Sequence, residues 1–428
     1  MSEITNQDSE HRTPASDLRS PSSDRSSPSG SAPRLEKTVR ITEQVWPEGT
    51  VPVVSILCVT YNHIDFIRDA VEGFLMQETT FPVEIVIHDD ASTDGTAEIV
   101  QAYQEKFPQL FRTILQKKNL YSSGNLPNGG EMAQRYCNGE FIALCDGDDY
   151  WISEEKLQKQ VEILKAKPSA SLIFHNTWVK HAESKSDYFL NQSIDKTEFT
   201  FEDVISRKWF IATPSMCFRR NYIKIKPNLS FCRSGDILIH AALSLRGTAL
   251  YLDEVMAVYT RHDGGISTQW DKSQDHFLEY TRTNHFWGYW VFSQNEFQGV
   301  LPNVMEKCLA GILGDLVFHY VRKEKSFPRI DQMAVRKNVL DCLEKAKPEV
   351  VGERVLDNPI VQRNISSLIE GYSTFHIQSL INQEIPKKRW LGILQMVVAA
   401  VARRAISPKR GCVLMAKAIL FHAKCVLK

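Results

Sequence analysis

The sequence predicts an α/β protein with a Rossmann-like, doubly wound mixed sheet, followed by a mostly helical C-terminal region. Apolar runs of strand length recur at 53–59, 83–87, 111–116 and 141–145, and helical patterns separate them. Continuous apolar runs are typical of parallel strands covered on both faces, and their alternation with helices indicates βαβ units. Polar clusters follow three of these strands, where ligands of such sheets bind.

Each of the first elements has a local signal. Asn62 stands at an N-cap position before apolar residues at helical spacing over 64–75, and Thr79 to Pro82 ends this helix. A second helix, over 96–107, is closed by a proline. A long loop rich in Gly and Asn, 117–130, leads through a short helix into the fourth strand.

The pattern continues beyond the fourth strand with longer spacings. We expect a helix at 154–167, a strand at 171–179, a strand-like stretch at 211–220 that breaks at a proline, an apolar segment at 237–245 and a strand at 249–259. After about residue 275 the pattern is mostly helical and contains no catalytic motif.

Composition predicts three parts. Residues 1–45 are rich in Ser, Pro, Asp and Arg and are expected to be disordered. Residues 46–275 form the α/β domain, and residues 276–428 form the helical C-terminal region. The nine cysteines never form a Cys-x-x-Cys pair, which indicates reduced thiols in the cytoplasm and neither disulfides nor structural zinc. No signal peptide opens the chain, and no apolar run reaches the roughly 18 residues that span a bilayer.

The charge is neutral overall and unevenly distributed. Residues 385–428 contain ten Lys or Arg and no acid, so the remainder carries 41 basic and 51 acidic side chains. The neutral total gives no indication of nucleic-acid binding. Basic side chains flank apolar stretches in this tail, as in segments that lie in the bilayer interface. We therefore expect a protein that is peripheral at the inner face of the membrane; the alternative is a helical lid packed on the domain.

Two acidic clusters carry the chemistry, at 88–96 (His-Asp-Asp-Ala-Ser-Thr-Asp-Gly-Thr) and at 146–151 (Asp-Gly-Asp-Asp-Tyr-Trp). Neighbouring carboxylates repel one another unless a cation neutralises them, and oxygen ligands suit Mg2+ or Mn2+. With Thr60-Tyr61-Asn62 they predict a metal-assisted site for a phosphate-bearing ligand.

Other interpretations of these clusters are ordinary turn chemistry or calcium loops. A calcium loop starting at Asp90 has Gln101 at the twelfth position, where Glu is needed. A loop starting at Asp146 has Tyr150 and Trp151 at its fifth and sixth positions, which disfavours it as well. No Gly-x-Gly-x-x-Gly follows the first strand, which disfavours a dinucleotide enzyme.

From Val53 to about Ser267 the chain resembles glycosyltransferase family 2, the nucleotide-sugar-dependent enzymes of the GT-A fold. The resemblance rests on Val-Thr-Tyr-Asn-His at 59–63, on both acidic clusters and on Lys-Leu-Gln-Lys-Gln at 156–160. It implies an inverting transfer from a nucleotide-diphosphate sugar, with a UDP-sugar favoured, to a glycan or lipid-linked acceptor in surface polysaccharide synthesis. The implied cofactor is Mn2+ or Mg2+.

The resemblance also implies a role for individual residues. The nucleotide-binding residues are Thr60, Tyr61, Asp90 and Asp146, and the metal-binding residues are Asp148, Asp149 and His262. Asp149 either shares the metal or caps the next helix, and His262 is alternatively an ordinary loop residue.

Asp236 matches the general base, although Gly235 stands where many members carry a second acid. It can also cap a helix that begins there, and the two roles are compatible. Trp209, Arg219 and Arg220 line an acceptor groove or have ordinary packing roles.

Two other classes of function remain open. A sugar-phosphate nucleotidyltransferase would share the sheet, but it would carry a Gly-rich basic loop where Tyr61-Asn62-His63 stands. An inactive nucleotide- or glycan-binding module would have lost one of the acids, and none is missing.

Overall fold

The structure is a computed structural model that describes residues 33–122, 129–181, 186–207, 209–223, 232, 235–265, 283, 285–289, 291, 302–323, 332–345 and 362–369. The first 32 residues and the basic tail, 385–428, lie outside the described residues, so the predictions made for them are not addressed.

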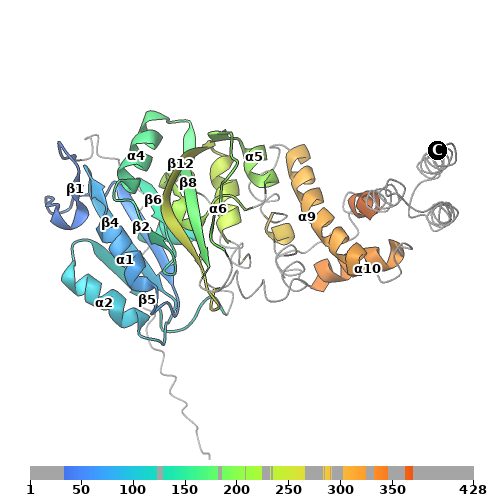
Figure 1. The fold of residues 1–428 in the computed structure, drawn as a ribbon, viewed down its shortest axis with the longest axis horizontal. Coiled ribbons are helices and arrows are strands. Elements are labelled where there is room, and N and C mark those ends of the chain that lie inside the picture. The colour runs from blue at the N-terminus through green and yellow to red at the C-terminus, as the bar shows by residue number, and fades with distance from the viewer. Residues whose placement is uncertain are drawn as a thin grey trace, which may run out of the picture. The chain divides into compact units, whose positions relative to one another are not determined.

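A ten-stranded mixed sheet forms the centre of the fold (Figure 1), with the strand order β10-β12-β8-β11-β6-β2-β4-β5. This path contains eight of the ten strands. The other two strands are short and lie off the path: β7 pairs with β12, and β9 pairs with β8. The strands are β2 Val54–Thr60, β4 Val83–Asp89, β5 Phe111–Leu115, β6 Phe141–Leu144, β7 Tyr150–Trp151, β8 Ala170–His181, β9 Tyr188–Phe189, β10 Glu198–Phe199, β11 Cys217–Arg219 and β12 Thr248–Arg261.

The helices lie between and after these strands. They are α1 Ile67–Leu75, α2 Thr96–Lys106, α3 Gly129–Tyr136, α4 Lys156–Ala166, α5 Phe201–Ser206, α6 Gly235–Ser244, α9 Pro302–Lys323 and α10 Gln332–Lys345. Within the described residues, no helix has both the length and the apolar character needed to cross a membrane.

Strands β6, β2, β4 and β5 form the parallel half of the sheet. Successive side chains of these strands point to opposite faces, and each face has its own core. On β2, Ile56 packs in the core that includes α1, α2 and α4, whereas Leu57 packs in the core that includes α5 and α6. This burial on both faces explains the continuous apolar runs and confirms the predicted mixed α/β sheet.

The second half of the sheet joins the parallel half through β11. Strand β11 runs antiparallel between β6 and β8, and β8 pairs in parallel with β12. Helix α9 packs near α5, where the Cys308 thiol donates to the Ile205 carbonyl at 3.4 Å. The described part of the C-terminal region is therefore helical, as predicted.

Residues 33–45, which the composition predicts to be part of a disordered extension, are described in the structure. Strand β1, Val39–Arg40, pairs with β3, Glu78–Thr79. Ile41 is fully buried, and the Gln44 amide donates to the Thr79 carbonyl at 2.8 Å. Residues 33–45 therefore belong to the folded domain, because one apolar side chain and one satisfied amide anchor this otherwise polar stretch.

Candidate active site

The site lies at the carboxyl ends of β2, β4 and β6, where the predicted polar clusters meet. Thr60 at the end of β2 pairs in register with Asp89 at the end of β4, and the Asp90 N–H donates to the Thr60 carbonyl at 2.9 Å. The Gly147 N–H, just after β6, donates to the Val59 carbonyl at 2.9 Å. Adjacent parallel strands thus bring the three loops together.

The loops after β2 and β4 are joined by hydrogen bonds. Asn62 has a left-handed φ of 54°, and its backbone N–H donates to Ser92 Oγ while its Oδ1 accepts from the Thr93 N–H, both at 2.8 Å. In the same way, the His63 N–H donates to Thr96 Oγ1 at 2.9 Å, and the Ile64 N–H donates to Asp94 Oδ2 at 3.0 Å. The prediction that Asn62 is an N-cap is wrong, because α1 begins only at Ile67 and Asn62 bridges two loops instead.

Asp90 organises the segment that follows β5. Its buried carboxylate accepts hydrogen bonds from the backbone N–H groups of Leu120, at 2.8 Å, and Tyr121, at 2.9 Å. Each carboxylate oxygen retains a further lone pair for a ligand. Of the other three residues predicted to bind the nucleotide, Thr60 is buried, Tyr61 is 43% exposed, and Asp146 lies in the turn after β6.

The acidic turn after β6 holds its three carboxylates in different states. Burial raises the pKa of Asp146 to about 8, with further contributions from the charges of Asp148 and Asp236. Burial and the charges of Asp148 and Asp146 hold the pKa of Asp149 well above its usual range. Burial would also raise the pKa of Asp148, but the hydrogen bond from His262 and the charges of His63 and His262 lower it. Without a cation, Asp146 and Asp149 therefore tend to be protonated and Asp148 ionised, and a bound cation would favour the ionised form of all three.

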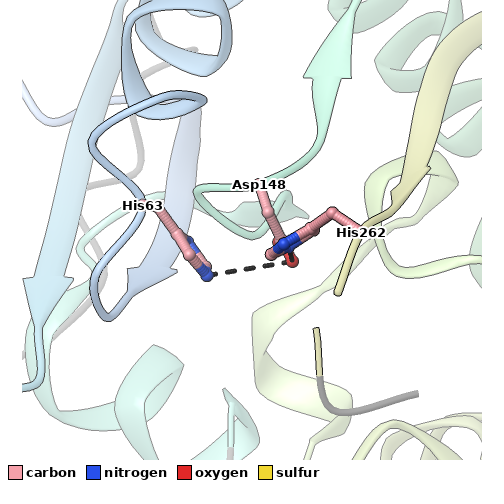
Figure 2. A group of neighbouring side chains, drawn as sticks. All are labelled: His63, Asp148 and His262. Carbon is pink, nitrogen blue, oxygen red and sulfur yellow. Dashed lines mark hydrogen bonds and ion pairs between the residues drawn. The ribbon is translucent and has the colours of Figure 1, made fainter. Parts of the chain in front are cut away.

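Asp148 faces two imidazoles (Figure 2). Its Oδ2 lies 3.2 Å from His262 Nε2 and 3.8 Å from His63 Nε2. The three residues can each direct one ligand atom to a common point, since these atoms lie within 4.8 Å of one another. Burial lowers the pKa of His63 despite the opposing charge of Asp148, so its imidazole tends to be neutral. The donor set fits a divalent cation.

His63 is the residue of this group that sequence reasoning missed. It ends the 59–63 motif that carries the family resemblance, so a signal was present. Its backbone carbonyl accepts from the N–H of Ile67 in the first turn of α1 at 2.8 Å, which fixes its position. Only the three-dimensional arrangement, however, brings its ring to Asp148.

Asp149 has a backbone partner on β12 and is not one of this group of three. Its Oδ1 accepts a hydrogen bond from the Thr260 N–H at 2.8 Å, and its side chain is almost fully buried. The bond ties the acidic turn to the end of β12, two residues before His262. Capping of the next helix, the other predicted role, is not observed, since residue 155 precedes α4 and no side chain caps it.

Asp236 is the second residue of α6 and is half-buried. Because the helix begins at Gly235, Asp236 lies in its first turn and is not its N-cap. An anion there is stabilised by the helix dipole. Its charge makes a small contribution to the raised pKa of Asp146, so the two carboxylates interact electrostatically.

Arg219 and Arg220 have the ordinary packing role that was the alternative to lining an acceptor groove. Arg219 donates to the Ala170 and Leu164 carbonyls at 3.0 and 2.5 Å, and Arg220 donates to the Gly139 carbonyl at 2.8 Å. Both guanidinium groups therefore hold backbone segments together. Trp209, in contrast, is 41% exposed and packs edge-on against Tyr259 with ring centroids 5.0 Å apart.

The 156–160 motif also has a structural role. Lys156 is completely buried, its Nζ donates to Gln160 Oε1 at 2.8 Å, and it lies 4.0 Å from the centre of the Trp151 ring. Burial lowers the pKa of this lysine to about 8. The motif thus anchors α4 under the turn that carries the acids.

Residues 55–226 match the profile of the family described as Glycosyl transferase family 2. An uncharacterized protein of Mycobacterium tuberculosis (strain H37Rv) is 36% identical over 236 residues, which are 55% of this chain and 63% of that protein, so less than two thirds of its length is matched. TuaG of Bacillus subtilis, named for teichuronic acid biosynthesis, is 27% identical over 249 residues, 57% of this chain and 94% of TuaG.

Two further proteins are similar over other extents. WfaP of Escherichia coli, named a UDP-Glc:α-D-GlcNAc-diphosphoundecaprenol β-1,3-glucosyltransferase, is 34% identical over 113 residues, 26% of this chain and 41% of WfaP. The structure of S. aureus TarS with UDP-GlcNAc has a TM-score of 0.49 and 16% identity, covering 82% of this chain and 92% of that chain.

The parallel half of the sheet, with polar loops at its carboxyl edge, is the architecture in which open α/β domains bind their ligands. The match to glycosyltransferase family 2 spans residues 55–226, which include the loops after β2, β4 and β6.

Proposed function

We propose that this chain is an inverting glycosyltransferase that moves a sugar from a nucleotide-diphosphate donor, with a UDP-sugar favoured, to a glycan or lipid-linked acceptor. The observation that carries the proposal is the convergence of the acidic turn, two histidines and Asp236 at one edge of the sheet. The names of TuaG and WfaP support surface polysaccharide synthesis as the setting, and WfaP's name supports a lipid-linked acceptor.

The donor would be held by residues of three loops. Thr60, Tyr61 and Asp90 lie where the family resemblance assigns the nucleotide base, and Asp146 lies where it assigns the ribose. Asp90 is already fixed by two backbone N–H groups, so its free lone pairs have a defined direction. In the absence of a cation, the raised pKa of Asp146 favours a protonated carboxyl, which can donate a hydrogen bond to a sugar hydroxyl.

Asp148 and His262 would hold the divalent ion, Mn2+ or Mg2+. The ionised Asp148 carboxylate and the adjacent His262 Nε2 make a suitable pair of ligands, and the Asp148 side chain is 20% exposed to an entering ligand. When bound, the ion neutralises the charge that develops on the leaving diphosphate. Asp149 would contribute mainly by holding the end of β12 and thereby His262 in place.

Asp236 would accept the proton of the attacking hydroxyl. A carboxylate within hydrogen-bond reach of that hydroxyl is a sufficient base. One base and one departing diphosphate on opposite sides of the anomeric carbon imply a single displacement, and hence inversion.

The experiment is a screen of the purified full chain against a panel of nucleotide sugars, with release of free nucleoside diphosphate as the readout. It is run with Mn2+, with Mg2+ and with chelator, and in parallel with Asp148→Ala. We expect one donor to be consumed only with a metal ion and only by the wild-type chain. A folded Asp148→Ala variant with undiminished turnover would contradict the metal assignment, and no turnover of any donor with acceptor glycans present would contradict the proposal.

The basic tail, 385–428, lies outside the described residues, and its membrane role stays a prediction. Each basic side chain near an anionic bilayer contributes about 1 kcal/mol, so half of its ten would give useful reversible attachment. Flotation with anionic liposomes, with and without these residues, tests it. Equal binding of both forms, or of neither, would contradict a membrane role for the tail.

A further inference from the structure

His63, Asp148 and His262 come from three separate loops and converge on one point (Figure 2). Both imidazoles turn the same atom, Nε2, towards the same carboxylate oxygen, at 3.8 Å for His63 and 3.2 Å for His262. The two rings are nearly perpendicular, with centroids 6.0 Å apart. Two nitrogen lone-pair donors and one carboxylate oxygen therefore surround a common position.

Simple ion pairing does not account for His63. At 3.8 Å its Nε2 is too far from Asp148 for a direct hydrogen bond, and His262 already occupies the same oxygen. No described residue is hydrogen-bonded to His63 Nδ1, which is buried. A half-buried imidazole that is held by its backbone, and whose buried Nδ1 has no hydrogen-bonding partner among the described residues, requires another explanation.

The backbone around His63 is rigid in a way that suits a ligand. Its N–H donates to Thr96 Oγ1 at 2.9 Å, and its carbonyl accepts from the N–H groups of Phe66 and Ile67 at 2.9 and 2.8 Å. The Phe66 ring packs against the His262 ring, with centroids 4.4 Å apart. Both imidazoles are thus positioned before any ion arrives, as a selective site requires.

We propose that His63 is a third protein ligand of the divalent ion, and that the two imidazoles make the site prefer a transition-metal ion such as Mn2+ or Co2+ over Mg2+. Mg2+ favours oxygen ligands and parts reluctantly with its waters, whereas imidazole nitrogen suits the transition metals. Three protein ligands leave open positions for diphosphate oxygens and water. The inference builds on the proposed function for the identity of those oxygens, but ion selection belongs to the protein alone.

The test measures metal binding to the full chain without any sugar donor. Free Mn2+ is followed by its electron paramagnetic resonance signal, bound Co2+ by its visible absorption, and Mg2+ is added as a competitor. The variant His63→Phe keeps a ring and removes both nitrogens. His181→Phe, at the end of β8, is the matched control for the same change outside the site.

We expect the wild type to retain Mn2+ against excess Mg2+. In His63→Phe we expect Mn2+ affinity to fall about tenfold or more, with a changed Co2+ spectrum and little change in Mg2+ affinity. His181→Phe should bind as the wild type. If His63→Phe does not fold, His63→Asn is measured in its place with the same expectation.

Two outcomes would overturn the inference. One is Mn2+ binding by a folded His63 variant with wild-type affinity and selectivity. The other is the absence of Mn2+ binding by the wild type, with and without UDP. A chain that binds Mn2+ through His63 but turns over no nucleotide sugar would support this inference while contradicting the proposed function.

Discussion

The Asp149 carboxylate accepts a hydrogen bond from the Thr260 N–H at 2.8 Å, which joins the turn after β6 to the end of β12. Since Asp148 precedes Asp149 and His262 follows Thr260 by two residues, the bond holds the segments that carry Asp148 and His262 together. It assigns Asp149 a positioning role that differs from that of its neighbour.

Asp149→Asn should therefore preserve the site. The amide oxygen can still accept from Thr260, so we expect Mn2+ affinity within a few-fold of the wild type. Asp149→Leu leaves the Thr260 N–H without this acceptor and should cost about 1–3 kcal/mol of stability together with metal affinity. Calorimetric Mn2+ titration and thermal unfolding of both variants check this. If Asp149→Asn keeps its stability but loses Mn2+ binding, Asp149 is a metal ligand.

The raised pKa of Asp146 predicts a pH-dependent stability of the metal-free protein. Its folded pKa of about 8 exceeds the value of about 3.9 in an unfolded chain, so the folded state holds an extra proton between these limits. This contribution is complete below pH 4 and is lost as the pH rises towards 8.

Asp146→Asn removes this titration. Between pH 5 and 8.5, with chelator present, we expect the Tm of the wild type to fall further than that of Asp146→Asn, because each unit of pH rise below the folded pKa costs up to about 1.4 kcal/mol of stability, or up to about 4 kcal/mol in all. The comparison cancels the titration of groups common to both proteins. Parallel Tm curves would contradict the raised pKa.

Gly147→Ala should damage the site through a steric clash. A Cβ there would lie 2.6 Å from Thr60 Oγ1 and 3.0 Å from His63 Nδ1, so both side chains would have to move. We expect UDP affinity to fall by about tenfold or more, a loss of roughly 1.4 kcal/mol. Gly311→Ala in α9 is the matched control, because its Cβ meets nothing within 4 Å. Replacing that helical glycine should be neutral or stabilise by about 0.5–1 kcal/mol. Wild-type UDP binding by Gly147→Ala would contradict the prediction.

Asp236→Asn should separate donor binding from turnover. A general base acts on the acceptor proton, so we expect kcat to fall by about 10²–10⁴ while donor affinity changes little. Asp253→Asn, an exposed acid on β12, provides the control and should leave both unchanged. If Asp236→Asn turns over normally, the base lies elsewhere, and Asp263 is the next residue to change.

The sequence predicts the parallel half of the fold well for a local reason. Strands such as β2 and β4 are buried on both faces, so their apolar runs mark their positions to within about two residues. The acidic clusters are equally visible, since each directly follows such a run. The polar residues before the apolar segment predict a helix start near Asp236, and α6 begins one residue before it, at Gly235.

The missed features depend on contacts between distant residues. The ring of His63 approaches Asp148 only because β2 and β6 pair. Asn62 is a residue type that often caps helices, but here it bonds to Ser92 and Thr93 of the next loop. Arg219 has the sequence of a surface cation, yet it is bound to backbone carbonyls of α4 and β8. Local patterns do not contain such partners.

The hydrogen bonds between the loops after β2 and β4 make the conformation of each loop depend on the other. Asn62, His63 and Ile64 all donate backbone N–H groups to side chains of the second loop, at 2.8–3.0 Å. Replacing one of these loops alone with that of a relative would therefore not transfer the relative's donor preference, because the new loop would lack its hydrogen-bond partners in the other loop. An engineered chimera must carry residues 60–66 and 89–96 together from the same parent.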